Sequence, residues 1–382
     1  MKALITLYWG CIFLMYLSQS NYPEGDVRSQ RHHRNFMLDR PDIFMCIIIA
    51  WLSCFMFLRT AYNDTGNYIF EWRRATPSLE EFLDSGELFK FGSNPLFKLY
   101  KSVLKEFTDS YHVMFFFPAV LSCVASIKLI KRFSVDPVFS LMVFFSVGTY
   151  VLYMAAVKQC FAIAILLYAL PYALDKKYIR FVLLVLFAVM FHTHAFIFLA
   201  VPFFFGRPWG KLTWCLLLAV LVAMATYERT FSALMEFALS IGVNVADIEV
   251  FDGHSINPLR ILVYSIPAMM SFFFRDRLYY NSTRAENLFA NLSIVAAFIL
   301  SIGLIQGANL FARMAAYYEI ALSLSFPWMI NKVFDRSSAK LIKTVAYPMF
   351  FVYFLYEFGI SKSFDIAYRS ITLWQFFQEV FQ

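Results

Sequence analysis

Long runs of apolar residues recur along this 382-residue chain and are separated by short polar loops. Most of these runs are long enough for an α-helix to cross the roughly 30 Å hydrocarbon core of a bilayer. They lie at residues 3–18, 42–58, 111–127, 138–154, 158–174, 179–205, 212–226, 258–274, 286–304, 313–331 and 341–358. The pattern predicts an all-α polytopic integral membrane protein in which residues 1–382 form a single membrane domain.

The run at 179–205 is ambiguous, because "FHTHAF" interrupts it near its middle. It is either one long helix or a tight hairpin of two short helices. Lys and Arg concentrate in cytoplasmic loops. With a hairpin, 19 of the 33 lysines and arginines fall on the same side as the basic loop 19–41. A single helix would move the last three basic loops to the other side. The charge pattern therefore favours a short, re-entrant-like hairpin, about twelve membrane segments, and both termini outside.

This topology places two long segments on the outer face. Residues 59–110 include Leu96, Leu99, Tyr100, Val103 and Phe107 at helical spacing, with lysines between them. That spacing predicts an amphipathic helix lying in the membrane interface. Residues 227–257 form the second outer loop, which has a polar, acidic second half.

Composition agrees with a membrane protein, since 60% of the residues are hydrophobic and only 15% are charged. The net charge of +7 is explained by basic cytoplasmic loops, so it does not indicate a nucleic-acid partner. The first apolar run lacks a small-x-small cleavage site and is interpreted as a retained helix. The cysteines show no CxxC spacing and all lie in apolar runs, which indicates neither a zinc site nor a disulfide framework. They are Cys11, Cys46, Cys54, Cys123, Cys160 and Cys215.

Several polar residues fall at the outer ends of the predicted helices, where ionisable groups are costly and often functional. Tyr62 and Tyr68 flank the first of them in "RTAYNDTGNY". These polar residues are Arg59, Asp64, Lys158, His192, His194 and Arg313.

Each of these residues also has an ordinary structural explanation. Arg59 and Lys158 can anchor helix ends at the interface. Asp64 can cap the next helix, and either histidine can be a hydrogen-bonded core residue. Arg313 can pair with Glu319.

Metal binding is not predicted. His192 and His194 are two residues apart, which suits a metal poorly on a helix, where ligands at i and i+4 share a face. The acidic outer loop, with Asp247, Glu249, Asp252 and His254, is either solvated or part of the same site.

Taken together, these residues predict a cavity at the outer face with three cations, one acid and two histidines. Cations beside a membrane cavity suit an anionic head group such as a phosphate or pyrophosphate. A single carboxylate among them stays ionised and can accept a proton from a hydroxyl.

The same residues resemble blocks of a known family. "RTAYNDTGNY" is similar to the Arg–x(4)–Asp–x(3)–Tyr signature of EpsG-type proteins, which are exopolysaccharide and O-antigen polymerases related to the Wzy group. "VKQCFAIAILLYAL", "LLVLFAVMFHTHAFIFLAVP" and "FARMAAYYEIALSLSFP" resemble the next three blocks, in the same order. The resemblance spans about residues 55 to 330. It implies a fold similar to that of integral-membrane type C glycosyltransferases.

The resemblance implies a polymerase in the bacterial inner (cytoplasmic) membrane, with its active site facing the periplasm or exterior. Such proteins join undecaprenyl-pyrophosphate-linked oligosaccharide repeat units into O-antigen, capsule or exopolysaccharide, in some cases with a chain-length regulator protein as partner. No cofactor is implied, because the sugar is already activated.

Carried onto this sequence, the family's catalytic positions are Asp64, His192 and Arg313. The implied substrate-binding residues, for pyrophosphate or sugar, are Arg59, Tyr68, Lys158, Gln159, His194 and Tyr317.

Three positions depart from the family pattern. Lys158 stands where Arg is usual, His194 where Ser is common, and Asn94 where a Glu often precedes the aromatic pair. Asp64 is therefore the one acid that we assign.

Two other functions remain open at this point. A membrane acyltransferase that modifies glycans could use His192, but it leaves the three cations unexplained. A flippase of lipid-linked oligosaccharides also needs a basic cavity, but it should show inverted repeats, and we find none.

Overall fold

The computed structural model describes residues 1–20, 41–74, 76–240, 255–361 and 367–381. These residues form an all-α structure, as predicted, with one two-stranded sheet. The helices are α1 (Lys2–Ser20), α3 (Ile43–Phe57), α4 (Thr65–Arg74), α5 (Leu79–Asp84), α6 (Pro95–Lys105), α7 (His112–Phe133), α8 (Pro137–Ser146), α9 (Thr149–Ala155), α10 (Val157–Leu174), α11 (Tyr178–Val189), α12 (Lys211–Ala225), α13 (Tyr227–Ser240), α15 (Pro258–Phe273), α16 (Arg275–Leu278), α17 (Arg284–Ile302), α18 (Ala308–Ala316), α19 (Ile320–Val333), α20 (Arg336–Leu355) and α21 (Leu373–Phe381). The 3-10 elements are η2 (Glu87–Phe89), η3 (Phe91–Ser93) and η4 (Thr193–Phe205), and η5 (Tyr356–Ile360) is a π-helix. The strands are β1 (Arg59–Ala61) and β2 (Arg369–Ser370).

Five helices are long and apolar enough to cross a membrane: α1, α7, α10, α17 and α20 with η5. The pair α8 and α9 gives a sixth span if it counts as one bent helix. Several further apolar helices, among them α3, α11, α12 and α15, are shorter than a full span. The described residues therefore fit a multi-pass membrane protein, while the predicted total of about twelve segments is not confirmed.

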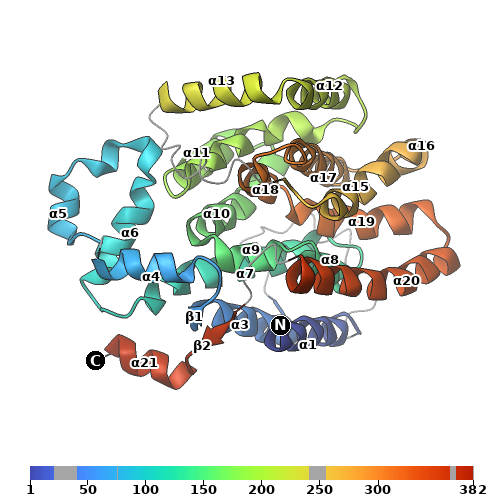
Figure 1. The fold of residues 1–382 in the computed structure, drawn as a ribbon. Coiled ribbons are helices and arrows are strands. Elements are labelled where there is room, and N and C mark those ends of the chain that lie inside the picture. The colour runs from blue at the N-terminus through green and yellow to red at the C-terminus, as the bar shows by residue number, and fades with distance from the viewer. Residues whose placement is uncertain (21–40, 75, 241–254, 362–366, 382) are drawn as a thin grey trace.

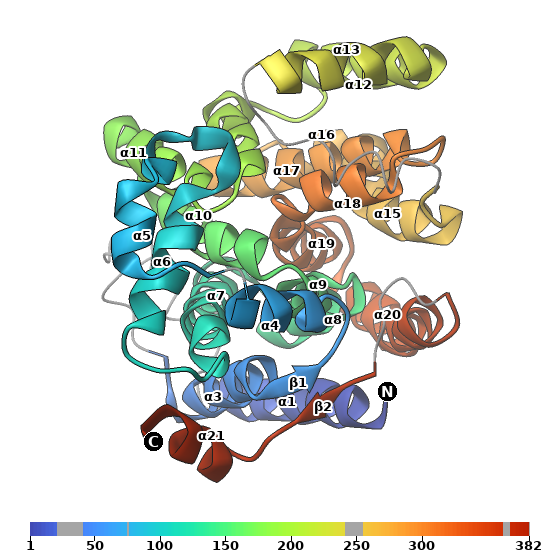
Figure 2. The same cartoon turned by 60° about the vertical axis from the view of Figure 1, so that its left-hand side comes forward.

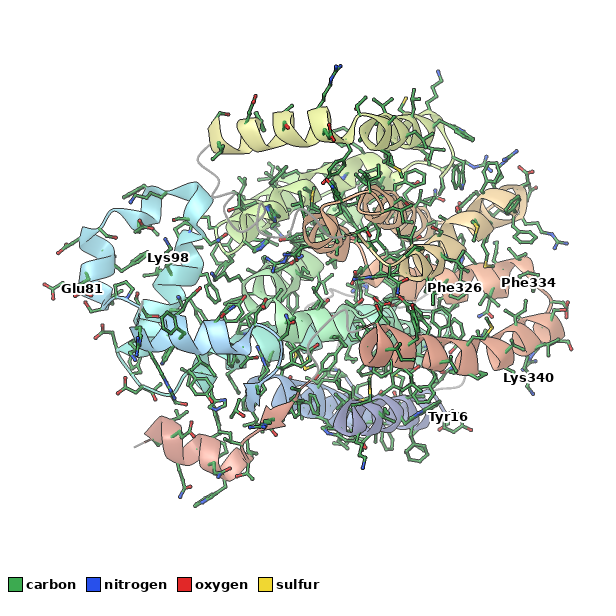
Figure 3. The ribbon with its side chains drawn as sticks, viewed as in Figure 1. Tyr16, Glu81, Lys98, Phe326, Phe334 and Lys340 are labelled. Atoms are coloured by element: carbon green, nitrogen blue, oxygen red, sulfur yellow. The ribbon has the colours of Figure 1, made fainter. Side chains whose placement is uncertain are left out.

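The helices are arranged in layers around α7 and α10 (Figure 1). Helices α1 and α3 lie along one side of this centre, and α12 and α13 lie on the opposite side in both views (Figure 2). Helices α4, α5 and α6 form a group at the edge. Glu81 on α5 lies on its outer rim, on the far side of the molecule from Lys340 on α20 (Figure 3).

The predicted helix at 138–154 is present but broken. Helices α8 and α9 meet at a bend of 49°, and every residue from 138 to 157 is buried. Gly148 stands at the break with φ +93°, a conformation that favours glycine. A Cβ atom there would lie 2.9 Å from the ring of Phe358. The break thus fits a close approach of η5 to the core.

The predicted hairpin at 179–205 is confirmed. Helix α11 ends at Val189, η4 begins at Thr193, and the two arms pack against each other through Phe181 and Phe198. The turn between the arms is tied to the segment 59–110. Leu96 donates its backbone N–H to the Met190 carbonyl at 3.0 Å. Asn94, which departs from the family pattern, accepts a 3.0 Å hydrogen bond from the Thr193 backbone.

Loops that were predicted to share a face do meet at one end of the bundle. At the end opposite the hairpin turn, Lys343 pairs with Asp136 at 2.6 Å. Arg284 donates to the Tyr178 hydroxyl at 2.8 Å. Four of the predicted loops thus contact one another in pairs, and the side of the membrane that they share stays a prediction. Which end faces the cytoplasm stays a prediction.

The described C-terminal residues return to the hairpin end. Strand β2 pairs antiparallel with β1, with Ser370 opposite Arg59. Tyr368 stacks on Phe55 at 3.9 Å, and Phe376 packs against Phe57. This segment therefore supports the chain around Arg59.

The predicted amphipathic helix corresponds to α6, and the protein core contacts part of its predicted apolar stripe together with other residues. Its buried residues are Pro95, Phe97, Lys101 and Ser102. Val103 is exposed, and Phe107 lies beyond the end of the helix. Lys98 pairs with Glu87 at 2.5 Å. Leu96 and Tyr100 of the apolar stripe pack against the core, so only part of the stripe, including Val103, is left exposed, and its contact with the interface stays a prediction.

Candidate functional site

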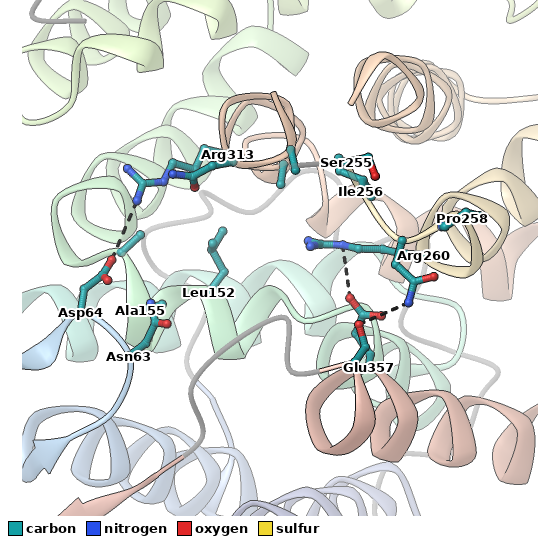
Figure 4. Close-up of a pocket in the computed structure, with 16 residues that line it drawn as sticks. Asn63, Asp64, Leu152, Ala155, Ser255, Ile256, Pro258, Arg260, Arg313 and Glu357 are labelled. Atoms are coloured by element: carbon teal, nitrogen blue, oxygen red, sulfur yellow. Dashed lines mark hydrogen bonds and ion pairs between the residues drawn. The ribbon is translucent and has the colours of Figure 1, made fainter. Parts of the chain in front are cut away.

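A cavity of about 560 Å³ opens at the end of the bundle where the hairpin turns. Residues far apart in sequence line it, from the segment after β1, from α9, from the start of α15, from α18 and from η5. Two charged pairs mark it (Figure 4). We call them the Asp64–Arg313 end and the Arg260–Glu357 end. The volume lies in the range of small-molecule sites.

At the Asp64–Arg313 end, Arg313 Nη2 lies 3.8 Å from Asp64 Oδ2, and both side chains are about one-third exposed. The structure thus brings together two residues that the sequence analysis assigned to one site. Gln159 at the start of α10 donates a 2.5 Å hydrogen bond from Nε2 to the Arg313 carbonyl. Gln159 Oε1 is buried and has no hydrogen-bond partner among the described residues.

The hairpin turn supports α18 from behind Arg313. A 2.6 Å hydrogen bond joins His192 Nδ1 to the hydroxyl of Tyr317, which is the C-cap residue of α18. The rings of His192 and His194 lie 5.1 Å apart. His194 Nδ1 is buried without a hydrogen-bond partner in the described part of the chain. His192, His194 and Tyr317 do not line the cavity. The hydrogen bond between His192 and Tyr317 instead holds the end of α18 and so positions Arg313.

Arg59 is buried beneath the Asp64 loop and does not line the cavity. Its guanidinium donates to Thr65 Oγ1 at 3.0 Å and to the Met56 carbonyl, and it lies 4.0 Å above the Phe115 ring. Arg59 Nη2 is buried with no hydrogen-bond partner among the described residues. The contacts hold the turn that presents Asp64.

Lys158 faces a carboxylate that the sequence analysis missed. Its ammonium lies 3.5 Å from Glu71, which also pairs with Lys101 at 3.0 Å. Burial acts to raise the pKa of Glu71, but the charges of Lys158 and Lys101 outweigh it and hold that pKa below its usual value. Glu71 follows Tyr68 by three residues on α4, a spacing that puts both on one helix face and could have identified it.

Tyr68 lies beside this ion pair. Its ring is 5.8 Å from the Lys158 ammonium and packs edge-on against Phe97 and Phe115. Burial raises the pKa of Tyr68 to about 12. The phenol therefore stays protonated at neutral pH and can donate a hydrogen bond.

The Arg260–Glu357 end was also missed. Arg260 in α15 lies 4.0 Å from Glu357 and 3.6 Å from Glu319 (Figure 4). Glu319 accepts hydrogen bonds from Tyr264 at 2.5 Å and Thr149 at 3.3 Å. The alternative pairing of Arg313 with Glu319 is therefore wrong, because Glu319 is engaged by Arg260 and Arg313 by Asp64.

A sequence signal for this end existed. Arg260 lies inside the apolar run 258–274, and a charged residue inside a membrane segment is a functional candidate. Tyr264 follows it by four residues, on the same helix face. The partner Glu357 could not be read from the sequence, because it depends on the π-helical turn η5 at the end of α20.

The sequence model of the EpsG family matches residues 42–370. The chain belongs to the EpsG family. This confirms the resemblance, and the family supports a role of the polysaccharide polymerase type. Comparisons with curated proteins and with solved structures gave no significant match. The matched region of this EpsG-family protein contains every residue that lines the cavity.

The acid–base properties of the EpsG-family cavity centre on Asp64. Burial raises the pKa of the Asp64 carboxyl, and the charge of Arg313 partly opposes this. An ionised Asp64 with a raised pKa is a better proton acceptor than a solvated aspartate.

Metal binding has no support from the described residues, which contain no group of three or more His, Cys, Asp or Glu side chains with the geometry to hold an ion. Asp247, Glu249, Asp252 and His254 of the acidic outer loop lie outside the described residues. So do most residues of the basic loop 19–41.

Proposed function

We propose that this EpsG-family protein is a glycosyltransferase that polymerises undecaprenyl-pyrophosphate-linked oligosaccharide repeat units into O-antigen, capsule or exopolysaccharide. The observation that carries the proposal is the cavity in which Arg313 and Asp64 face each other at 3.8 Å. A guanidinium suits a pyrophosphate, and a neighbouring carboxylate suits the hydroxyl that attacks the sugar.

The reaction needs one bond exchange. The bond between the anomeric carbon of the donor and its pyrophosphate oxygen breaks, and a bond forms between that carbon and a hydroxyl oxygen of the acceptor. Asp64 takes the proton of this hydroxyl, and the electron pair leaves with the pyrophosphate. Arg313 stabilises the negative charge that develops there, which is commonly the largest contribution to catalysis.

The remaining site residues act around this pair. His192, Tyr317 and Gln159 hold α18 and so set the position of Arg313. Arg59 holds the turn that carries Asp64, while Lys158 adds positive potential near the mouth of the site. Tyr68 and His194 do not line the cavity, so they would bond to sugar or phosphate oxygens only where the substrate extends beyond it. No cofactor is required, because the pyrophosphate is already a good leaving group.

We further propose that the cavity opens to the periplasm or exterior side of the bacterial inner membrane, where lipid-linked repeat units would enter from the bilayer. About twelve segments would then be embedded, and the exposed apolar side chains of α11 and α12 would face lipid. A chain-length regulator would be a partner on the same face. The placement of β1, α4, α18 and η5 at one end of the bundle is consistent with this.

The test is complementation of a gene deletion in the native host. Surface polysaccharide is separated on a gel after restoring wild type or Asp64→Asn at matched membrane expression. We expect a ladder of polymer lengths with wild type and single-repeat product with Asp64→Asn. A full ladder in the deletion strain, with altered decoration only, would contradict a polymerase and favour the acyltransferase.

The acid limb of the pH profile should report Asp64. Because its folded-state pKa is raised, activity that needs the ionised carboxylate is present at neutral pH and is lost as pH falls through that raised value. We expect the acid limb of the kcat/KM profile of the purified protein to have an apparent pKa above about 3.9, the value for an unperturbed aspartate. A limb at or below that value would show that Asp64 is not the titrating base.

A further inference from the structure

We propose that the Arg260–Glu357 end of the cavity is the subsite for the acceptor sugar. This inference rests on the proposed function and assigns a place to the second substrate. The Asp64–Arg313 end would hold the donor's pyrophosphate and the reacting hydroxyl. The acceptor's sugar rings would then extend along the cavity toward α15 and η5.

Burial distinguishes the two ends of the cavity. The side chains of Arg260 and Glu357 are 10% and 1% exposed, whereas those of Arg313 and Asp64 are 32% and 39% exposed. A lipid-linked pyrophosphate has to enter from the membrane surface, so the more open end suits it. The deeper end suits an acceptor sugar that is not itself attached to the lipid.

Unused hydrogen-bonding capacity points to a ligand at the deeper end. Arg260 Nε is buried and has no hydrogen-bond partner among the described residues, and it lies 4.0 Å from Glu357 Oε1. That separation is too long for a direct hydrogen bond. A sugar hydroxyl between the two atoms could accept from Arg260 and donate to Glu357, which would satisfy the buried donor.

Charge also separates the ends. Arg260 faces two carboxyl groups, Glu319 and Glu357, so its charge is already balanced within the protein. Among the described residues, Arg313 is paired in the cavity with one carboxyl group, Asp64, at 3.8 Å, so its charge is less fully offset than that of Arg260. A pyrophosphate therefore favours the Arg313 end, and a neutral sugar is the better fit beside Arg260.

The deeper end is rigid and polar, as sugar recognition requires. Tyr264 and Thr149 fix Glu319, which in turn fixes Arg260. Asn257 at the start of α15 donates to Tyr356 at 3.2 Å and to Ser361 at 3.3 Å, and so ties α15 to the two ends of η5. Preorganised side chains of this kind lower the cost of binding a flexible ligand.

The test uses the full-length protein in detergent with a donor and a labelled acceptor. Only product that carries the acceptor's label is counted, because the lipid-linked unit can itself serve as an acceptor. The donor is the lipid-linked repeat unit extracted from the deletion strain. The acceptor is the same oligosaccharide released from its lipid pyrophosphate by mild acid, which has no leaving group and can act only as acceptor. Transfer is measured while each concentration is varied, for wild type, Glu357→Gln and Asn257→Ala, which removes the hydrogen bonds between α15 and η5 at the deeper end. Asp136→Asn is the control, because it removes a partly buried ion pair at the opposite end of the bundle.

We expect Glu357→Gln to raise the acceptor concentration for half-maximal transfer about tenfold or more, as for the loss of a charged hydrogen bond. The donor concentration for half-maximal transfer should stay within about twofold of the wild-type value. Asn257→Ala should raise the acceptor concentration for half-maximal transfer by a smaller factor, which keeps the test valid if Glu357→Gln does not fold. The subsite would be overturned if a folded variant kept the wild-type acceptor concentration for half-maximal transfer. It would also be overturned if only the donor concentration for half-maximal transfer rose. No transfer by wild type would instead overturn the proposed function and the subsite with it.

Discussion

Replacing Arg313 by alanine should lower the polymerisation rate by about two to three orders of magnitude, as for removal of one preorganised donor at a developing charge. Arg313 lies at the more open end of the cavity, paired with Asp64 at 3.8 Å. Its loss would leave the pyrophosphate without a guanidinium and Asp64 without its charge partner. Polymer formed per hour from purified lipid-linked repeat units is the measurement.

Two further variants separate charge from geometry. Arg313→Lys keeps the charge but loses bidentate contact, so its rate should lie between those of alanine and wild type. Arg74→Ala removes an exposed guanidinium on α4 at the same end of the bundle and should leave the rate within about twofold. Equal rates for Arg313→Ala and wild type, at equal folded yield, would remove Arg313 from the chemistry.

The sequence predicted the fold class because it depends on local signals. Apolar runs report helices, and basic loops report sides. The hairpin at 179–205 was found in this way, although η4 is a 3-10 helix that no periodicity indicated. Span lengths were predicted less well. The run 138–154 is broken at Gly148, because Phe358 occupies the space that a side chain would need.

Half of the candidate site could be predicted for the same reason. Asp64 and Arg313 stand at the ends of apolar runs, where a charge is conspicuous, and the structure brings them to one cavity. Arg59 and Lys158 stand at similar positions, but they contact Phe115 and Glu71 outside that cavity. A helix-end position places a residue at the right depth. It does not tell which way the side chain points.

The other half of the site depends on long-range packing. Glu357 reaches the cavity because α20 ends in a π-helical turn, and Arg260 is held by Glu319 from a different helix. Neither fact has a local signal. A buried acid within an apolar run, such as Glu319, indicates that a cation is nearby, but only the fold identifies that cation as Arg260.

Glu319→Ala should be the most destabilising of these substitutions, by about 3–5 kcal/mol in the free energy of unfolding, because it leaves a buried charge without its closer partner. Glu319 is fully buried, and Arg260 lies 3.6 Å from it, against 4.0 Å from Glu357. Tyr264 and Thr149 would also lose their acceptor. The measurement is the unfolding midpoint of the purified protein in mixed micelles.

A combined substitution tells whether the cost is one of charge or of packing. With Arg260→Met, Glu319→Leu and Glu357→Gln together, none of the three charges is left buried, and well-packed neutral replacements of such groups are often tolerated. We therefore expect the combined variant to be more stable than Glu319→Ala while remaining inactive, since Arg260 belongs to the proposed acceptor subsite. If the losses in unfolding free energy of the separate substitutions simply add in the combined variant, then packing, and not charge pairing, sets the stability of this end of the cavity. Stability that recovers without activity would separate the folding role of Glu319 from the binding role of Arg260.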